Sequence, residues 1–503
     1  MSVSSLPFLH GALAAVLPKL AAWRRDFHAH PEAGWTEFRT AALIIRRLRE
    51  LGYAIRMGEA ACASDRRMGV PSSAVLAAAR ERALEHGADA ELVGGMGDGY
   101  TGFWADLDCG PGPVTAFRFD MDCNEVAECA EESHRPVREG FASRWPGLMH
   151  ACGHAAVGLG LAEVLVSIRR HLRGRIRLIF QPAEEGARGA LPMSEAGAVD
   201  GVDVLFGFHI GFKAEGPGSL ICGTQGFLAT TKRDVLFSGV PAHAGAAPEE
   251  GKDALLAACS AVVNLHAISR NGKGGTRIAV GRLEGGEARN VIPASARLFM
   301  ETRGETTELD AYMTAESERI LRASADLWGC ACEWRTVGNS AGGGSSPELA
   351  RLIATVAEAM GGWKTVIPMS GFGATEDFAC LMSRVQASGG LASYLQVGTD
   401  RAAGHHSDRF DFDETCLGRA LELLARLAVR MAGGGQEDTE TETESDMEFL
   451  DEVVRRKGIH VQLWLEGEDG EGFGRGRVEL LQLVDELGSL SKAAKQLGMS
   501  CRG

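Results

Sequence analysis

The hydrophobic pattern of the chain alternates between helical spacing and short continuous apolar runs. Leu9, Leu13, Leu17 and Leu20 recur on one helical face near the N-terminus, and residues 158–171 form a second helix-like run. Apolar runs typical of buried strands, each followed by polar residues, cover 114–122, 175–185, 202–211 and 392–398. This alternation predicts an α/β fold with a mixed, largely parallel sheet covered by helices.

The segment from 227 to 338 has a different pattern, with strands and helices in the order βαββαβ. The expected strands cover 233–238, 277–283, 296–303 and 332–337, and the expected helices cover 252–269 and 308–327. This is the order of a ferredoxin-like α+β unit. The stretch GNSAGGGSSPE that follows is typical of a hinge. We therefore predict a small α+β domain inserted into a larger one.

These patterns divide the chain into four predicted parts. The larger domain covers 1–226 and 339–432, and the inserted domain covers 227–338. Residues 433–457 form an acidic linker, because most of this stretch is rich in Glu, Asp and Thr and lacks basic residues. Residues 458–503 end in a helix-turn-helix pattern, in which Gly498 breaks one helix and Ser500 caps the next.

Charge and cysteine content exclude several classes of protein. The chain has 503 residues, enough for about three domains of roughly 150 residues each. Its net charge of −15 argues against a general nucleic-acid binder or a binder of anionic membranes. Twelve cysteines without a CxxC pair indicate reduced thiols, so we expect a cytoplasmic protein. No segment has the ~18–20 apolar residues of a membrane span, and the N-terminus does not read as a signal peptide.

Residues that could hold a metal ion follow several of the expected strands or lie in nearby loops. Taken singly, each has a plainer explanation: CGH can begin a buried helix, Glu-Glu and His-His can be surface loops, and a histidine can belong to the core. Taken together they supply sulfur, nitrogen and oxygen ligands at one edge of the sheet, which favours zinc, manganese or cobalt over magnesium. The candidates are Cys152, His154, Glu184, Glu185, His209, His405 and His406, with Asp120 and Asp122 at another strand end.

Longer motifs resemble a known family. RRDFHAHPEAGWTEFRT, MHACGH, IFQPAEEGARGA, PAHAGAAPEEGKDALLAA, ARNVIPASA and HHSDRFDFDE occur in the order and spacing of the aminoacylase/carboxypeptidase superfamily of dinuclear metallopeptidases, from about residue 23 to 431. Within it they resemble most the branch that contains one subunit of aminobenzoyl-glutamate hydrolase. The resemblance implies a catalytic α/β domain with a ferredoxin-like lid that also mediates dimerisation.

The resemblance also implies roles for single residues. The ligands of two divalent metals, zinc or manganese with cobalt as the alternative, are Cys152, His154, Glu185, His209 and His406. The choice between His405 and His406 stays open, and His406 is preferred because the family's ligand directly precedes a small polar residue. Glu184 is the general base and Asp122 orients the site. His243 stabilises the oxyanion, in the partner subunit's site by expectation, and Arg289 and Asn290 hold the substrate carboxylate.

The implied activity is hydrolysis of the amide bond of an N-acyl or aroyl amino acid, with p-aminobenzoyl-glutamate as the leading candidate substrate. The implied assembly is a homodimer, or a heterodimer with a homologous subunit. One departure is Ala155, where relatives place an Asp after CGH, so a catalytically impaired subunit is an alternative. A second alternative is a ligand-sensing regulator, since 458–503 resembles a truncated winged helix-turn-helix of molybdate-responsive regulators. That segment lacks the recognition helix and wing, so we expect no DNA binding.

Overall fold

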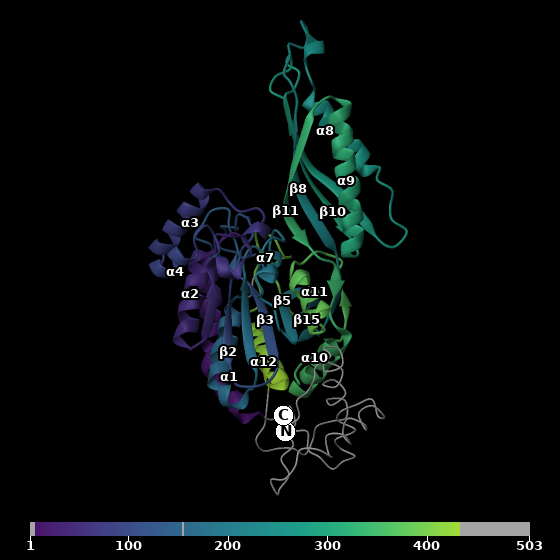
Figure 1. Ribbon diagram of the computed structural model, residues 1–503. Helices are drawn as coiled ribbons and strands as arrows, with labels where there is room; N and C mark the ends of the chain where they lie inside the picture. The colour runs from purple at the N-terminus through teal and green to yellow at the C-terminus, as the bar shows by residue number, and fades with distance from the viewer. Residues whose placement is uncertain (1–5, 153–154, 433–503) are drawn as a thin grey trace, which may run out of the picture.

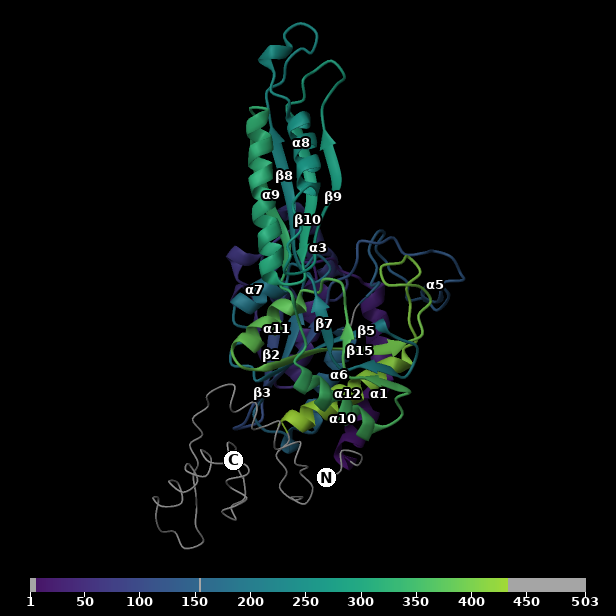
Figure 2. The same cartoon turned by 90° about the vertical axis from the view of Figure 1, so that its right-hand side faces the viewer.

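The chain folds into a three-layered α/β body and a smaller lid that extends from one end of it (Figures 1 and 2). The computed structural model describes residues 6–152 and 155–432. Within these ranges, no helix combines the length and the apolar composition needed to cross a lipid bilayer. The predicted acidic linker and helix-turn-helix segment lie outside the described residues.

The body is built on a mixed eight-stranded sheet in the order β1-β2-β4-β3-β5-β15-β6-β13. Its four inner strands β4, β3, β5 and β15 are parallel to one another, which confirms the predicted largely parallel arrangement. A small second sheet has the order β12-β7-β14. The body strands are β1 Ala54–Met57, β2 Phe103–Asp108, β3 Val114–Asp120, β4 Arg175–Gln181, β5 Val204–Glu215, β6 Ser219–Ile221, β7 Thr224–Phe227, β12 Gly343–Gly344, β13 Thr365–Ile367, β14 Ser370–Gly371 and β15 Leu391–Thr399.

Helices cover both faces of the large sheet and enclose two apolar cores. α1, α2, α6, α10 and α12 contribute to the larger core on one face, and α7 and α11 contribute to the smaller core on the other. The body helices are α1 Pro7–Ala29, α2 Phe38–Glu50, α3 Ser73–Glu85, α4 Ala90–Gly95, α5 Arg135–Arg138, α6 Ala155–Ser167, α7 Ala190–Glu195, α10 Pro347–Met360, α11 Phe378–Ala387 and α12 Thr415–Ala432.

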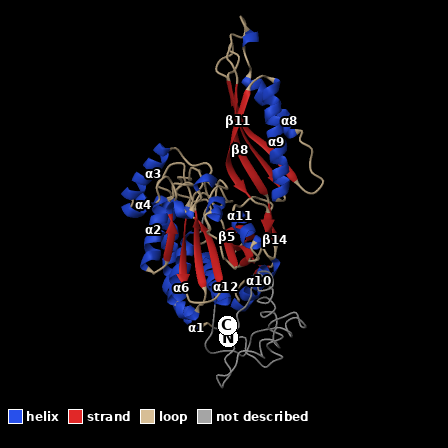
Figure 3. Ribbon diagram, in the orientation of Figure 1, coloured by secondary structure: helices blue, strands red, loops and turns tan. Residues whose placement is uncertain are grey.

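The lid is an antiparallel sheet with two helices on one face (Figure 3). The strand order is β11-β8-β10-β9, which is the ferredoxin-like order, and Val235, Phe237 and Leu298 pack against α8 and α9 in a core of their own. The lid elements are β8 Ala229–Ser238, α8 Ala254–His266, β9 Thr276–Gly285, β10 Ser295–Gly304, α9 Thr307–Leu327 and β11 Ala331–Ser340. The predicted βαββαβ unit is therefore confirmed, while the exact domain boundaries stay predictions.

Two details differ from the sequence-based expectations. The run 175–185 leaves the sheet at Gln181, so its two glutamates lie in a loop and not in an extended strand. Leu17 is 42% exposed although Leu9, Leu13 and Leu20 are buried, because α1 turns Leu17 away from the core. The early end of β4 matters for function, since it frees the backbone around the two glutamates to fold on its own.

Helix α6 lies unusually close to the sheet, and Gly158 makes this possible. A Cβ atom at residue 158 would lie 2.7 Å from a ring atom of Phe119 on β3 and 2.9 Å from one of Phe180 on β4. Real Cβ atoms do not approach ring carbons this closely. The missing side chain therefore fixes the distance between α6, which follows Cys152 in the chain, and the two strands.

We expect Gly158→Ala to destabilise the protein although alanine favours helices. Relief of the clash with two buried rings typically costs about 1–3 kcal/mol, against a helix-propensity gain of up to about 1 kcal/mol. The matched control is Gly11→Ala in α1, where no atom lies within 4 Å of the added Cβ, so only the propensity gain remains. Chemical unfolding should show the two variants shifting the midpoint in opposite directions, and equal shifts would contradict the packing argument.

Candidate metal centre

The loop after β4 carries Glu184 and Glu185, and buried carboxylates hold its backbone at both ends. Glu37 accepts a hydrogen bond from the backbone N–H of Ala183 at 2.8 Å. Asp377 accepts from the backbone N–H groups of Gly189 and Ala190 at 3.2 and 3.0 Å. Ala183 and Ala187 have left-handed backbone angles, φ 51° and 57°, which non-glycine residues rarely adopt. The loop is thus kept in a strained shape by its surroundings.

Asp122 holds the middle of the same loop, two residues beyond the end of β3. Its two carboxylate oxygens accept hydrogen bonds from the backbone N–H groups of Glu184 and Glu185 at 2.9 and 3.1 Å. Burial raises the pKa of Asp122 to about 6, and the charge of Asp120 adds to the rise. This contact is what the orienting role expected for Asp122 requires.

Cys152, which precedes α6, and His209, which lies within β5, are side by side. The Cys152 Sγ atom is 2.8 Å from Nε2 of His209. The other ring nitrogen of His209, Nδ1, is 2.8 Å from the carbonyl oxygen of Ile210 and therefore donates its hydrogen there. In the neutral ring this leaves the lone pair of Nε2 facing Cys152. A histidine fixed by a backbone carbonyl in this way is the usual form of a metal ligand.

The two histidines that follow β15 face different partners. Nδ1 of His405 is 3.7 Å from the Cys152 sulfur, and Nε2 of His405 accepts a hydrogen bond from the backbone N–H of Phe212 at 3.0 Å. Nε2 of His406 is 3.4 Å from Oε2 of Glu185, and His406 has a left-handed φ of 63°.

The hydrogen bonds distinguish these two histidines by their chemistry. Because Nε2 of His405 accepts a hydrogen, its Nδ1 carries the proton in the neutral ring and points a hydrogen, not a lone pair, toward the thiol of Cys152. His406 has no such constraint in the described contacts and lies beside Glu185. The geometry therefore favours His406 as ligand and His405 as a hydrogen-bond donor to the sulfur.

Potential ligand atoms form two overlapping groups that share Cys152. Ligand atoms of Cys152, His209 and His405 lie within 4.8 Å of one another, as do those of Cys152, Glu185 and His406. Burial, together with the neighbouring carboxylates, raises the pKa of Cys152, Glu184 and Glu185 well above their usual values. Divalent cations would relieve this surplus of buried acidic groups, and sulfur, nitrogen and oxygen donors suit zinc, manganese or cobalt.

Sequence reasoning missed a buried network beneath this centre. Arg118 on β3 is fully buried and donates to Glu376 and Asp377 at 3.0 and 3.3 Å, and to Asp120 at 3.4 Å. Tyr394 on β15 donates from its hydroxyl to Glu376 at 2.7 Å. A charged residue inside the apolar run VTAFRFD was the available signal for Arg118, whereas Glu376 and Asp377 carry no strand-end pattern.

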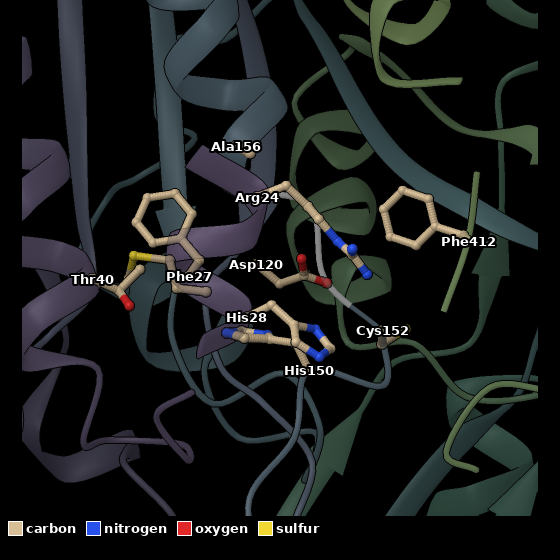
Figure 4. A pocket seen from close by; sticks show the side chains of 10 residues that line it. Arg24, Phe27, His28, Thr40, Asp120, His150, Cys152, Ala156 and Phe412 are labelled. Carbon is tan, nitrogen blue, oxygen red and sulfur yellow. The ribbon is translucent and has the colours of Figure 1, made fainter. Parts of the chain in front are cut away.

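A small cavity of about 30 Å³ adjoins Cys152 on the side toward α1 (Figure 4). Asp120, His28 and His150 are among the residues that line it. The cavity has the size of about one bound water molecule, and its polar lining suits one. His28 is anchored behind it, since its Nε2 donates to the buried carboxylate of Glu128 at 2.8 Å.

Some expected site residues do not join this cluster. His243, Arg289 and Asn290 are exposed and lie in the connections β8–α8 and β9–β10. The register of β8 with β10 places these connections at the end of the lid that points away from the body (Figure 1). The backbone N–H of Ala244 donates to the carbonyl of Asn290 at 3.0 Å, so the two connections lie together. His154 is outside the described residues.

Comparisons with known proteins agree with the fold. Residues 116–430 match the family described as peptidase family M20/M25/M40. The chain is 44% identical over 429 residues to an indole-3-acetyl-aspartic acid hydrolase of Enterobacter agglomerans, covering 84% of this chain and 98% of the relative. It is 44% identical over 420 residues to one subunit of p-aminobenzoyl-glutamate hydrolase of Escherichia coli strain K12, covering 82% and 96%.

Two solved structures are also similar. An aminobenzoyl-glutamate utilization protein from Klebsiella pneumoniae has a TM-score of 0.72 and 39% identity, over 84% of this chain and 98% of that one. A dinuclear metal-binding peptidase of the M20 family from Bacillus subtilis has a TM-score of 0.57 and 25% identity, over 83% and 98%.

We expect Asp122→Asn to weaken metal binding more than it weakens the fold. The amide keeps one acceptor oxygen but loses the other and the negative charge, so the loop of Glu184 and Glu185 is held less firmly. Changes of this kind typically cost about 10- to 100-fold in metal affinity. Chelator competition measures the loss, with Asp108→Asn on the exposed end of β2 as control. Equal metal affinity in both variants would contradict the orienting role.

Proposed function

The chain belongs to peptidase family M20/M25/M40, and from this premise we propose that it hydrolyses the amide bond of an N-acylated acidic amino acid. The first candidate is p-aminobenzoyl-glutamate, which would give p-aminobenzoate and glutamate. Both relatives at 44% identity are named for such compounds, one with aspartic acid and one with glutamate. The observation that carries the proposal is the convergence of Cys152, Glu185, His209 and His406. The carboxylate of Glu184 lies with Glu376 and Asp377, close enough to contribute to the raised pKa of the Cys152 thiol.

The proposed cofactor is a pair of divalent metal ions, held by Cys152, Glu185, His209 and His406, with His154 as the further expected ligand. A dinuclear peptidase of the same family is among the similar structures, and the two donor groups share Cys152. When bound, divalent cations supply Lewis-acid polarisation of the scissile carbonyl and acidify the attacking water.

Glu184 is the proposed general base and acid. Its carboxylate is not among the donors grouped with Cys152, but it is adjacent in sequence to Glu185 and half-buried. It takes a proton from the attacking water and returns that proton to the leaving amine nitrogen. Asp122 keeps Glu184 and Glu185 in register through its two backbone hydrogen bonds, and Cys152 is steadied by the hydrogen that His405 directs at its sulfur.

The site needs a residue from a second chain in this proposal. His243, Arg289 and Asn290 are exposed at the distal end of the lid, far along β8 from the body. We propose that they reach the site of a partner, where His243 stabilises the oxyanion and Arg289 and Asn290 hold the α-carboxylate. The partner is a second copy of this chain or a homologous subunit, in keeping with the Escherichia coli relative, whose name describes it as one subunit of its hydrolase.

Replacing the proposed base tests the chemistry. We expect Glu184→Gln to lower kcat on p-aminobenzoyl-glutamate by about 10²- to 10⁴-fold, because proton transfer is lost while the metal ligands stay. Metal content should remain that of the wild type, and Glu50→Gln on the exposed face of α2 should leave kcat unchanged. Wild-type protein that binds metal but turns over no acyl-amino acid would point to an impaired subunit, and full activity of Glu184→Gln would remove Glu184 from its role.

Mixing inactive variants tests the shared site. His243→Ala should lower kcat by about 10²- to 10³-fold, as expected for loss of an oxyanion donor. If two copies pair symmetrically, exchanging subunits between His243→Ala and Glu184→Gln creates hybrids with one intact site, and activity returns to about a quarter of the wild type. Activity that stays at the sum of the two variants would exclude a second copy as the partner.

A further inference from the structure

Lys232 occupies a position on the lid that faces the loop after β4, which carries Glu184 and Glu185. It lies on β8, with Glu301 of β10 and Gly338 of β11 as its cross-strand neighbours. The next residue, Arg233, points to the helical side of the sheet, where it donates to Glu318 of α9 at 2.6 Å. Side chains alternate along a strand, so Lys232 points to the opposite, open face.

The base of the lid touches the loop that follows Glu184 and Glu185. The backbone N–H of Asn339 on β11 donates to the carbonyl of Ala187 at 2.8 Å. A Cβ at Gly338 would collide with the carbonyl oxygen of Gly186 and would lie 3.1 Å from Cδ of Lys232. The lysine side chain therefore runs alongside Gly186, next to the proposed catalytic glutamate.

Arg188 brings a second positive charge to the same place. Its guanidinium packs over Gly186, and its Nη1 donates to the carbonyl of Gly69 at 3.3 Å. Gly69 leaves room for it, since a Cβ there would lie 2.9 Å from Cδ of Arg188. The absence of side chains at Gly69 and Gly186 thus leaves the space that the Arg188 side chain occupies.

Neither cation forms a direct ion pair within the described part of the chain, although carboxylates act on both from a distance. Lys232 and Arg188 are half-buried, and no carboxylate there lies within ion-pair distance of either, whereas nearby Arg303 is paired with Glu301 at 2.8 Å. Burial lowers the pKa of Lys232. The negative charges of Glu301 and Glu184 raise that pKa, and the positive charge of Arg188 lowers it, so these charges act on one another. Two adjacent, partly desolvated cations favour an anionic ligand between them.

We propose that Lys232 and Arg188 bind the side-chain carboxylate of the acidic amino acid in the substrate, and so select glutamate or aspartate over neutral amino acids. The inference rests on the proposed function, which places the scissile amide at Glu184. In the proposed function, Arg289 and Asn290 of the partner bind the α-carboxylate of the substrate. The side-chain carboxylate therefore needs other cations. Lys232 and Arg188 lie beside the base and, among the described residues, have no carboxylate as an ion-pair partner.

A matched pair of substrates isolates the charge that these residues recognise. p-Aminobenzoyl-glutamate and p-aminobenzoyl-glutamine have nearly the same shape, but the first has a charged side-chain carboxylate where the second has a neutral amide. We expect the wild type to prefer glutamate, and Lys232→Met to lower kcat/KM for glutamate by about 10- to 100-fold, the usual worth of a charge-assisted hydrogen bond. The loss should fall mainly on KM, and kcat/KM for glutamine should change less than about twofold.

Two further variants and a control separate recognition from folding. Lys232→Arg keeps the charge and should retain most of the preference, and Arg188→Gln should lose it as Lys232→Met does. Lys273→Met changes an exposed lid lysine and should leave both substrates unaffected. Calorimetry of glutamate and glutamine as ligands gives a readout without turnover: the wild type should bind glutamate more tightly, and Lys232→Met should bind both alike.

The outcomes distinguish failure of the subsite from failure of the proposed function. Wild type that hydrolyses neither compound and binds neither amino acid overturns the proposed function and the subsite with it. Wild type that hydrolyses both without preferring glutamate overturns the subsite alone. Equal losses of kcat/KM on both substrates in Lys232→Met and Arg188→Gln show a structural role and also overturn it, as do variants in which the preference is unchanged.

Discussion

Three buried carboxylates from three separate elements accept backbone hydrogen bonds from a single loop, and the candidate site depends on them. Glu37 precedes α2, Asp122 follows β3, and Asp377 precedes α11, yet all three accept from residues 183–190. Such bonds favour the charged carboxylate, while burial opposes it and raises the pKa of Glu37 to about 8 and of Asp377 to about 7. Arg118 supplies a compensating charge to Asp377 from the middle of the sheet. The loop can therefore hold two strained alanines and present Glu184 and Glu185 at fixed positions.

This constraint explains why much of the architecture was predictable and part of the site was not. Strand runs such as 114–122 and the βαββαβ order follow from local hydrophobic pattern, and both were confirmed. Cys152, Glu185 and His209 were predicted because strand ends of a parallel sheet meet at one edge. The two glutamates were expected in extended backbone just after a strand, but they lie in a loop, because its shape comes from distant carboxylates that no local pattern reveals. Arg118 and Glu376 escaped for the same reason, as their partners are far apart in sequence.

The histidine pair shows where the chemistry of hydrogen bonds adds to motif reasoning. Sequence left His405 and His406 as alternatives and preferred His406 by resemblance. The backbone N–H of Phe212 occupies one nitrogen of His405 and so fixes which atom of that ring bears the proton. A contact with a residue nearly two hundred positions away thus separates two neighbours that the sequence treats alike.

Strand β8 has a mechanical consequence. Lys232 is near its start, where the lid meets the body, and His243 follows its far end, so about 20 Å of strand lies between Lys232 and the loop that carries His243. If the lid tilts about its junction with the body, the strand acts as a lever whose short arm carries Lys232. A small displacement of Lys232 then becomes a several-fold larger displacement of the His243 loop. In the proposed function, such a tilt would couple substrate contact at Lys232 in one site to the position of His243 in the partner's site.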